Sequence, residues 1–299
     1  MSESELQDET ELPGRRSAEP VYFDSHMHTP LCKHAYGQPI AYARNGMRRG
    51  LKGIIMTCHS PMPDGFSSSV RMDPEEFPEY VELVHDSAEQ LEGQFLIRLG
   101  LESDWFPGME GWLKELHRRA EFHYILGSVH PFLPEYKDRF FNGDVVDFQK
   151  GYFGHLADAA ETGLFDCLAH PDIVKVMTVH DYQFPRLEEA IDSALGRIKR
   201  AGVAMELNTS GWIKQGFPEV NPGPEMLAMM ARHHIPVVIG SDSHRPERVA
   251  ADFEPALDQL EAAGYQTVNF YEERMRCEVA IPVVRKSLRR TRMYAAEKV

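Results

Sequence analysis

Short apolar runs alternate with longer amphipathic segments along most of the chain. The apolar runs are rich in β-branched and aromatic residues and predict buried strands, whereas the segments between them predict amphipathic helices. Several of these helical segments end at a glycine, as helix C-termini tend to. Strands are predicted at 21–25, 53–57, 95–101, 124–129, 165–169, 204–208 and 236–240. Helices are predicted at 39–50, 74–92, 109–122, 147–163, 186–201 and 222–233, and a weaker helix–strand pair at 251–263 and 265–270.

This alternation predicts an α/β protein. Six or seven βα repeats without a break in composition favour a parallel sheet closed into a barrel. The 299 residues are enough for one large domain. Residues 1–19 are polar, Glu-rich and without apolar periodicity, so we expect a disordered tail there and a folded domain over 20–299.

Composition and charge narrow the class of protein. The net charge of −14 argues against stable binding to nucleic acid or to anionic membranes. No apolar run approaches the ~20 residues of a membrane span, and no signal peptide is visible. The four cysteines are far apart and contain no C-x-x-C pair, so neither a disulfide framework nor a zinc knuckle is indicated. We therefore expect a cytoplasmic protein, and the sequence leaves both a monomer and a homo-oligomer open.

Residue types that bind metals follow the predicted strands. The first strand ends in Asp24-Ser25-His26-Met27-His28. Residues two apart in an extended chain project to the same face, so His26 and His28 present two imidazoles to one ion. The carboxyl ends of barrel strands converge on one rim, and the other strand ends also carry histidine or a carboxylate. The nine candidate ligands are His26, His28, His34, His59, Glu102, His130, His170, Asp242 and His244.

A single histidine at a strand end is more often a hydrogen-bonded structural residue than a ligand. Several strand ends with histidine are harder to explain in this way, because unpaired buried polar groups are costly. Nine ligands would serve two or three divalent ions, and a His-rich set suits Zn²⁺, Fe²⁺ or Mn²⁺. Three such ions with two carboxylates would leave about +4 at the rim, so we expect an anionic, phosphorylated small substrate.

The motifs also resemble a known family, the polymerase-and-histidinol-phosphatase (PHP) family of metal-dependent phosphoesterases, and within it the histidinol-phosphate phosphatase branch. The matching motifs are Asp24-Ser25-His26-Met27-His28, His34, Thr57-Cys58-His59-Ser60-Pro61, Gly100-Leu101-Glu102-Ser103-Asp104, Gly127-Ser128-Val129-His130, Ala169-His170-Pro171-Asp172, Glu206-Leu207-Asn208-Thr209-Ser210-Gly211 and Gly240-Ser241-Asp242-Ser243-His244. The resemblance implies a distorted (β/α)7 TIM-like barrel in one domain, with a trinuclear centre.

The resemblance also implies which ligands share an ion. The first ion would be held by His26, His28, Glu102 and Asp242. The second would be held by Glu102, His130 and His170, and the third by His34, His59 and His244. Attack on phosphorus by a metal-bridging hydroxide would then make Glu102, Asp242 and His244 the catalytic residues.

Cationic side chains are expected to bind the phosphate group. Lys175 and Lys214 are the first candidates, although the resemblance leads us to expect arginine near these places. Arg71 and Arg245 are the alternatives. Asn208 is expected to hold substrate or a metal ligand, and a turn-forming role is the other interpretation.

Three functions follow from these observations. The first is a phosphomonoesterase that hydrolyses histidinol phosphate to histidinol and phosphate in histidine biosynthesis. The second is a PHP phosphoesterase that acts on a nucleotide, a sugar phosphate, phosphotyrosine or an oligonucleotide 3′ end. The third is a non-catalytic metal-binding module, and the complete ligand set counts against it.

Overall fold

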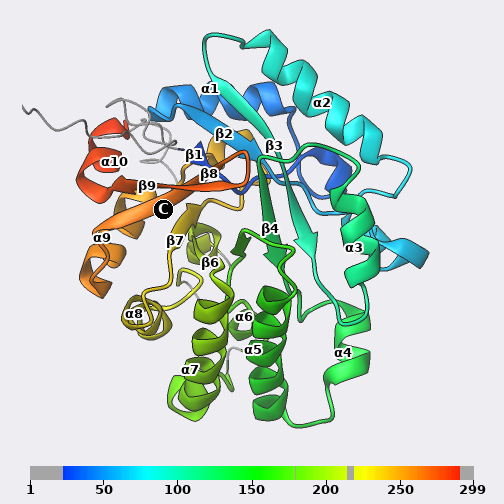
Figure 1. The fold of residues 1–299 in the computed structure, drawn as a ribbon, viewed down its shortest axis with the longest axis vertical. Coiled ribbons are helices and arrows are strands. Elements are labelled where there is room, and N and C mark those ends of the chain that lie inside the picture. The colour runs from blue at the N-terminus through cyan, green and yellow to red at the C-terminus, as the bar shows by residue number, and fades with distance from the viewer. Residues whose placement is uncertain (1–22, 179, 214–218, 290–299) are drawn as a thin grey trace, which may run out of the picture.

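A parallel β-sheet is the centre of the fold (Figure 1). The computed structural model describes residues 23–178, 180–213 and 219–289. Within these ranges nine strands follow one another in sequence order, the first eight parallel and the last antiparallel. The strands are β1 (Phe23–Asp24), β2 (Gly53–Met56), β3 (Leu96–Asp104), β4 (Tyr124–Ser128), β5 (Cys167–Leu168), β6 (Ala204–Asn208), β7 (Val237–Gly240), β8 (Thr267–Glu272) and β9 (Met275–Ala280). The predicted α/β class is confirmed, whereas the predicted tail 1–19 lies outside the described residues.

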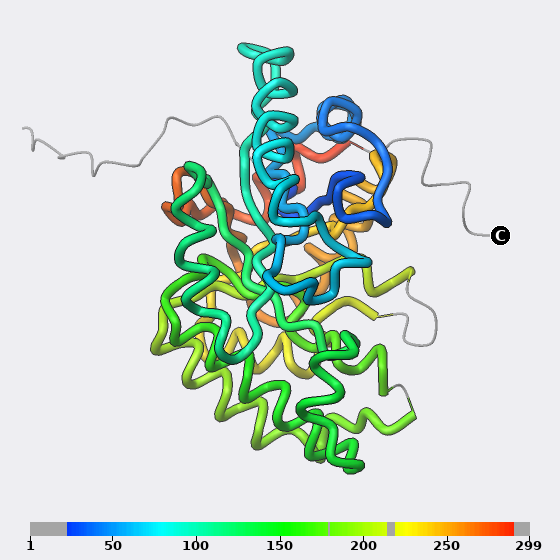
Figure 2. The backbone as a smooth tube through the Cα atoms, turned by 90° about the vertical axis from the view of Figure 1, so that its right-hand side faces the viewer, coloured from blue at the N-terminus to red at the C-terminus, as the bar shows by residue number. Residues whose placement is uncertain are grey.

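Helices lie around the outside of the sheet (Figures 1 and 2). Their bounds are α1 (Pro39–Arg49), α2 (Phe77–Gln90), α3 (Glu110–His117), α4 (Pro134–Phe140), α5 (Val145–Glu161), α6 (Val174–Met177), α7 (Phe184–Ala201), α8 (Pro224–Arg232), α9 (Phe253–Ala263) and α10 (Ile281–Ser287). In both views α5 and α7 pack side by side. None of the helices in the described ranges combines the length and the apolar composition needed to cross a bilayer.

The sheet closes into a barrel at the carboxyl end of its strands. Just beyond β1 and β7, Met27 and Ser243 form a parallel bridge. The backbone N–H of His28 donates to the Ser243 oxygen at 2.9 Å, and that of Ser243 donates to the His26 oxygen at 3.0 Å. Farther down, β7 instead pairs with β8 through Val238 and Asn269. The result is a distorted seven-stranded barrel, as predicted, with β8 and β9 as an added hairpin.

Alternate residues along the strands face opposite sides of this sheet. Ile54 and Met56 on β2 belong to the large apolar cluster beneath the helices, whereas Ile55 belongs to a smaller cluster inside the barrel. Leu126, Ala204 and Val238 also belong to the inner cluster. The same alternation turns Glu102 and Glu206 toward the inside, so polar groups lie above the inner apolar cluster.

The hairpin of β8 and β9 is only partly predicted. Glu272 pairs with Met275, so the loop consists of Glu273 and Arg274, and both have positive φ (52° and 65°). Two-residue hairpin loops of this conformation usually contain asparagine or glycine, so the sequence lacks the ordinary turn signal. Strand β9 is exposed or half-buried along its whole length, so no buried apolar run marks it in the sequence.

Tyr80 on α2 contacts the backbone of β2 and of β3, the strands that position His59 and Glu102. Its buried hydroxyl lies 2.8 Å from the Met56 oxygen and 2.9 Å from the Gly100 oxygen, and it accepts from the Cys58 N–H at 3.2 Å. We expect Tyr80→Phe to lower the free energy of unfolding by about 1–3 kcal/mol, because it leaves these buried backbone groups unpaired. Urea unfolding would measure this change.

Tyr265→Phe is the matched control. Its half-buried hydroxyl makes a single bond, to the Ile235 oxygen at 3.0 Å, so a loss of about 1 kcal/mol or less is expected. Equal losses for both variants would contradict a special role for Tyr80.

Candidate metal centre

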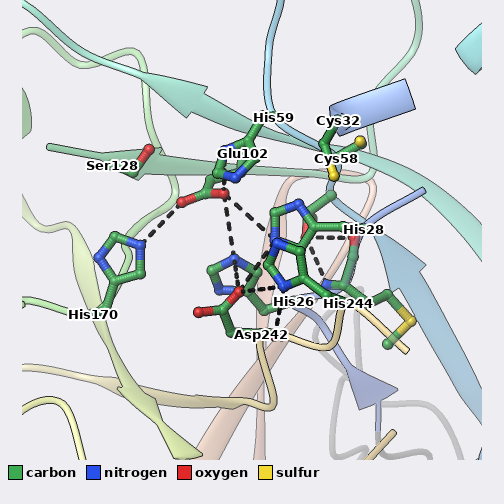
Figure 3. Close-up of polar contacts among 12 residues, drawn as sticks. His26, His28, Cys32, Cys58, His59, Glu102, Ser128, His170, Asp242 and His244 are labelled. Carbon is green, nitrogen blue, oxygen red and sulfur yellow. Dashed lines mark hydrogen bonds and ion pairs between the residues drawn. The ribbon is translucent and has the colours of Figure 1, made fainter. Parts of the chain in front are cut away.

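Glu102 lies at the centre of the barrel mouth, surrounded by imidazoles (Figure 3). Its Oε2 is 2.8 Å from His59 Nδ1. Its Oε1 is 3.1 Å from His170 Nε2 and 3.4 Å from His130 Nε2. Four predicted ligands from four different strand ends therefore meet at one carboxylate.

Asp242, just after β7, brings in the two histidines of the first strand. Its Oδ1 is 3.2 Å from His28 Nε2 and 3.7 Å from His26 Nε2. These two Nε2 atoms also lie 3.6 Å and 3.5 Å from Glu102 Oε2. The Ser210 hydroxyl donates to Asp242 Oδ2 at 2.9 Å. Two imidazoles and two carboxylates thus face a common point.

The remaining predicted ligands form a third group. One ligand atom each from His34, His59 and His244 lies within 4.8 Å of the others. His34 Nε2 is 2.8 Å from His244 Nε2, and His34 Nδ1 lies 2.7 Å from the Cys32 oxygen. His34 is the most exposed of the three. The structure therefore brings all nine predicted residues to one rim.

Two of these residues have unusual backbone conformations. His170 has φ 27° and Asp242 has φ 49°, in the left-handed region that side chains rarely occupy. Such conformations persist only where surrounding contacts hold them, and they occur often at functional sites. The His170 N–H donates to Glu206 Oε2 at 2.9 Å, and this bond helps to hold the turn.

The site contains buried polar atoms that other described residues do not satisfy. His26 Nε2, both ring nitrogens of His28, His59 Nδ1 and Glu102 Oε2 make no contact with hydrogen-bond geometry among them, although His59 Nδ1 and Glu102 Oε2 lie only 2.8 Å apart. Buried polar atoms without partners are costly. Because His26 Nε2 and His28 Nε2 both lie within 3.6 Å of Glu102 Oε2, a bound cation would satisfy several of these atoms at once, and the mixed nitrogen and oxygen donors suit a divalent transition metal.

Electrostatics in the site divide the imidazoles into two classes. Burial lowers the pKa of His59 to about 3 and that of His244 to about 2, against the opposing effect of nearby carboxylates. Burial also lowers the pKa of His28 and of His130. The nearby carboxylates outweigh this effect, Asp242 for His28 and Asp104 for His130, and raise each pKa to about 9. Although burial alone would raise it, the surrounding histidines hold the pKa of Glu102 well below its ordinary value. Without a metal ion, some imidazoles would therefore carry protons in place of the cation.

Buried carboxylates beneath the ligands were not assigned a role from sequence. Asp104 contacts His130 Nδ1 and Arg71 at short range and accepts from Ser128 Oγ at 2.7 Å. Glu206 Oε1 lies 2.7 Å from His26 Nδ1. Carboxylate partners of this kind orient metal-binding imidazoles. Asp104 follows Glu102 by two residues on the same strand face, so the alternation of β3 is a signal that could have found it.

A cavity of about 390 Å³ opens above the candidate ligands. Five imidazoles, both carboxylates and the guanidinium groups of Arg71, Arg245 and Arg248 line it, together with apolar side chains. His26 and His28 are fully buried and are absent from this lining. Arg248 was not predicted from sequence, although it follows Arg245 by three residues.

Comparison with known proteins places this site in a family. The model of the PHP domain matches residues 24–210, more than half of the chain. The chain belongs to the PHP family. All nine predicted ligands except Asp242 and His244 lie inside the matched PHP segment.

Similar proteins cover nearly the whole PHP chain. A Deinococcus radiodurans protein named probable histidinol-phosphatase is 34% identical over 262 residues, covering 84% of this chain and 97% of that protein. The Bacillus subtilis histidinol-phosphatase is 23% identical over 263 residues, covering 79% of this chain and 98% of that protein.

Two solved structures share the PHP fold. The putative histidinol phosphatase of Listeria monocytogenes has a TM-score of 0.70 at 18% identity, covering 78% of this chain and 99% of its own. The Lactococcus lactis histidinol phosphate phosphatase, solved with zinc, L-histidinol and phosphate, also has a TM-score of 0.70, at 17% identity, covering 85% of this chain and 98% of its own.

The structure corrects the expectation for Lys175 in this PHP protein. Its ammonium is fully buried, lies outside the cavity lining, and donates to Asp172 Oδ2 at 2.9 Å, Glu219 Oε2 at 3.0 Å and the Val220 oxygen at 2.5 Å. An ammonium has three N–H donors, and these partners account for them. Lys175 is therefore committed to a structural ion pair and cannot reach a phosphate in the cavity.

The other predicted phosphate contacts are placed differently. Arg71 and Arg245 both line the cavity, while Lys214 lies outside the described residues. Asn208 is buried below it, where its Nδ2 donates to Glu206 Oε2 at 2.9 Å and its Oδ1 accepts from the Ser210 N–H at 3.0 Å. This geometry favours the supporting and turn-forming roles of Asn208 over contact with substrate.

Lys175→Met tests the structural interpretation. We expect the free energy of unfolding to fall by about 3–5 kcal/mol, since Asp172 would be left buried without its cation. Urea unfolding would measure the loss, and Lys114→Met, at an exposed lysine on α3, should stay within about 0.5 kcal/mol of the unmodified protein. Unchanged stability together with weaker inhibition by inorganic phosphate would restore Lys175 as a phosphate ligand.

Proposed function

We propose that this PHP protein is a metal-dependent phosphomonoesterase whose substrate is histidinol phosphate. One observation carries the proposal, namely that seven of the nine candidate ligands and three arginines line one cavity of about 390 Å³, with His26 and His28 buried directly beneath it. Relatives along nearly the whole chain bear the name histidinol-phosphatase. The products of this reaction would be histidinol and inorganic phosphate.

Charge around the cavity favours an anionic substrate. Three arginines line it beside two acidic residues, Glu102 and Asp242. With neutral imidazoles this lining already has a net positive charge, in a chain whose net charge is −14. Divalent ions would add to this charge. A compact phosphate dianion is thus better suited to the site than a neutral ester.

Three groups of residues would hold two or three ions of zinc, iron or manganese. They are His26, His28, Glu102 and Asp242; Glu102, His130 and His170; and His34, His59 and His244. Bound divalent ions would supply an activated water molecule and neutralise charge on the phosphate oxygens. Glu102 and Asp242 place negative charge between the imidazoles, and His244 adds a neutral donor at the open side of the cavity. For this reason we assign catalytic roles to Glu102, Asp242 and His244.

The arginines would orient the phosphate group. Arg71 is buried and donates to the Ser60 oxygen at 3.1 Å while it contacts Asp104, so its position is fixed. Arg245 is exposed, and its guanidinium carbon lies 5.5 Å from the centre of the Tyr36 ring. Arg248 is held at 2.9 Å from Asp252 Oδ2. We assign phosphate contact to Arg71 and Arg245, with Arg248 beside them.

Apolar side chains would surround the leaving group. Val70, Phe132, Leu133, Ile173 and Ile213 line the same cavity. Phe132 and Ile213 are 45% and 59% exposed, so they leave apolar surface at the cavity that a ligand could cover. The Phe132 ring lies 5.0 Å from that of His130 at the edge of the ligand cluster. An aromatic head group such as the imidazole of histidinol could pack against it.

The proposed substrate can be tested by a panel of phosphoesters. We expect kcat/KM for histidinol phosphate to exceed that for p-nitrophenyl phosphate and AMP by about 100-fold or more, since both the phosphate and the head group would be bound. Short single-stranded DNA should not be cleaved at a comparable rate. A specificity constant for histidinol phosphate no higher than for the others would support a PHP phosphoesterase with another substrate.

Asp242→Asn tests the metal centre. Removing this charge should lower bound zinc, measured by plasma mass spectrometry, and reduce kcat/KM by more than about 100-fold, because even the outer partners of metal ligands contribute 10–100-fold. Circular dichroism should show an intact barrel. Full activity in protein from which chelation has removed all metal would refute the proposed mechanism.

Arg245→Gln tests the phosphate contact. Loss of one charge-assisted hydrogen bond should raise KM and the inhibition constant of inorganic phosphate by roughly 10-fold. Arg44→Gln, at an exposed position on α1, is the control and should change neither value. An Arg245 variant with an unchanged phosphate inhibition constant would leave Arg71 and Arg248 as the contacts.

A further inference from the structure

Glu206 on β6 is a buried carboxylate whose two oxygens are both engaged by the metal-binding layer. Oε1 lies 2.7 Å from His26 Nδ1. Oε2 accepts from the His170 N–H at 2.9 Å and from Asn208 Nδ2 at 2.9 Å. Only 1% of the residue surface is exposed, so water cannot replace these partners.

We propose that Glu206 is a positioning residue that fixes the tautomer of His26. An ionised carboxylate only accepts hydrogen bonds, so the proton at the 2.7 Å contact must be carried by His26 Nδ1. The lone pair is then on Nε2. This inference rests on the proposed role of His26 as a metal ligand, and it adds a residue outside the nine ligands.

The surroundings of His26 Nε2 agree with this tautomer. Nε2 has no hydrogen-bond partner among the described residues and faces Glu102 Oε2 at 3.5 Å and Asp242 Oδ1 at 3.7 Å. These oxygens are too distant for good hydrogen bonds but are arranged around a common point. A cation at that point would use the free lone pair.

Within the described ranges, Asn208 also lies near His26 Nδ1, so its contact must be compared with that of Glu206. Its Nδ2 lies 3.5 Å from Nδ1 but 2.9 Å from Glu206 Oε2. The amide nitrogen carries two N–H donors, but its contact with Nδ1 is at the outer limit of a hydrogen bond, and an unprotonated Nδ1 would place two acceptors 2.7 Å apart. The amide therefore donates to Oε2, and Nδ1 donates to Oε1. Asn208 thus supports Glu206 and does not compete with it.

The fold reserves space for this contact. A Cβ atom at Gly240, on the neighbouring strand β7, would lie 1.9 Å from Glu206 Oε1 and 2.8 Å from His26 Cβ. A glycine is thus required where the carboxylate meets the imidazole. Since Oε2 also holds the backbone of His170, one side chain connects ligands that we assign to two different ions.

Glu206→Gln separates a positioning role from simple packing, because the two side chains have nearly the same shape. An amide offers one accepting oxygen and one donating nitrogen. If its oxygen faces His170 and Asn208, its NH₂ group donates to His26 Nδ1 and leaves the proton on Nε2. In the opposite orientation its NH₂ group faces the His170 N–H and the Asn208 NH₂ group. All three are donors, so no hydrogen bond can form there. The first arrangement changes the tautomer of His26, and the second removes the hydrogen bonds that hold Glu206 and the His170 backbone in place.

The test is a cobalt(II) titration of metal-free protein, followed by visible absorption and by bound cobalt. We expect Glu206→Gln to weaken cobalt binding by about 10–100-fold relative to the unmodified protein, with an altered absorption spectrum. Asp166→Asn is the matched control, since it makes the same carboxylate-to-amide change at a residue that accepts from the Ile125 N–H at 2.7 Å, below the site. It should reduce stability while leaving cobalt binding unchanged.

The outcomes are distinguishable. Superimposable titrations for Glu206→Gln and the unmodified protein would overturn the positioning role alone. An unmodified protein that binds no cobalt would instead refute the proposed metal-dependent function.

A second measurement does not require Glu206→Gln to fold. Long-range ¹H–¹⁵N NMR of the zinc-loaded, unmodified protein, with ¹⁵N-labelled histidine, should show the His26 proton on Nδ1. The signal would be assigned by its absence in His26→Gln. A proton on Nε2 would overturn the proposal.

Discussion

The burial of one carboxylate, Glu102, among imidazoles is the interaction on which the rest of the site depends. A buried carboxylate without compensating charge is very costly. Here His59, His130 and His170 lie within 3.4 Å of its oxygens, and His26 and His28 lie slightly farther away. These histidines follow four different strands and Glu102 lies on a fifth, so the carboxylate is compensated only when strands β1 to β5 have assembled into the sheet. The bridge between Met27 and Ser243 completes that closure at the level of the ligands.

Beneath this layer the barrel interior contains further buried charge. Asp104 contacts both His130 and Arg71, and Glu206 contacts His26. Such groups seldom add stability, because the loss of hydration offsets their attraction. These carboxylates instead orient the imidazoles. A carboxylate that binds one ring nitrogen fixes the direction in which the other nitrogen points. The apolar cluster farther down, with Leu126 and Val238, supplies the packing that the polar layer does not.

Membership of the PHP family and the geometry of the cavity lead to the same function by separate routes. The family is established from residues 24–210 and from a relative at 34% identity. The cavity independently combines metal-ligand groups, three arginines and an apolar wall. The first two features favour a phosphate ester, and the apolar wall favours a leaving group larger than a simple alcohol. Histidinol phosphate satisfies all three requirements.

Much of this protein follows from sequence alone. Apolar periodicity predicted β1 to β8 and most of the long helices, and strand-end chemistry predicted the nine residues that meet at the rim. Local patterns are sufficient here because strand alternation and barrel geometry place such residues without further information. Only the tertiary structure separated Lys175 from the cavity, since its partners Glu219 and Val220 are more than forty positions away in the chain. The same holds for Glu206 and His26, which are 180 residues apart. Sequence determines which groups each strand end carries. The pairing of one buried charged or polar group with another depends on distances that are set only when the strands have assembled into the closed barrel.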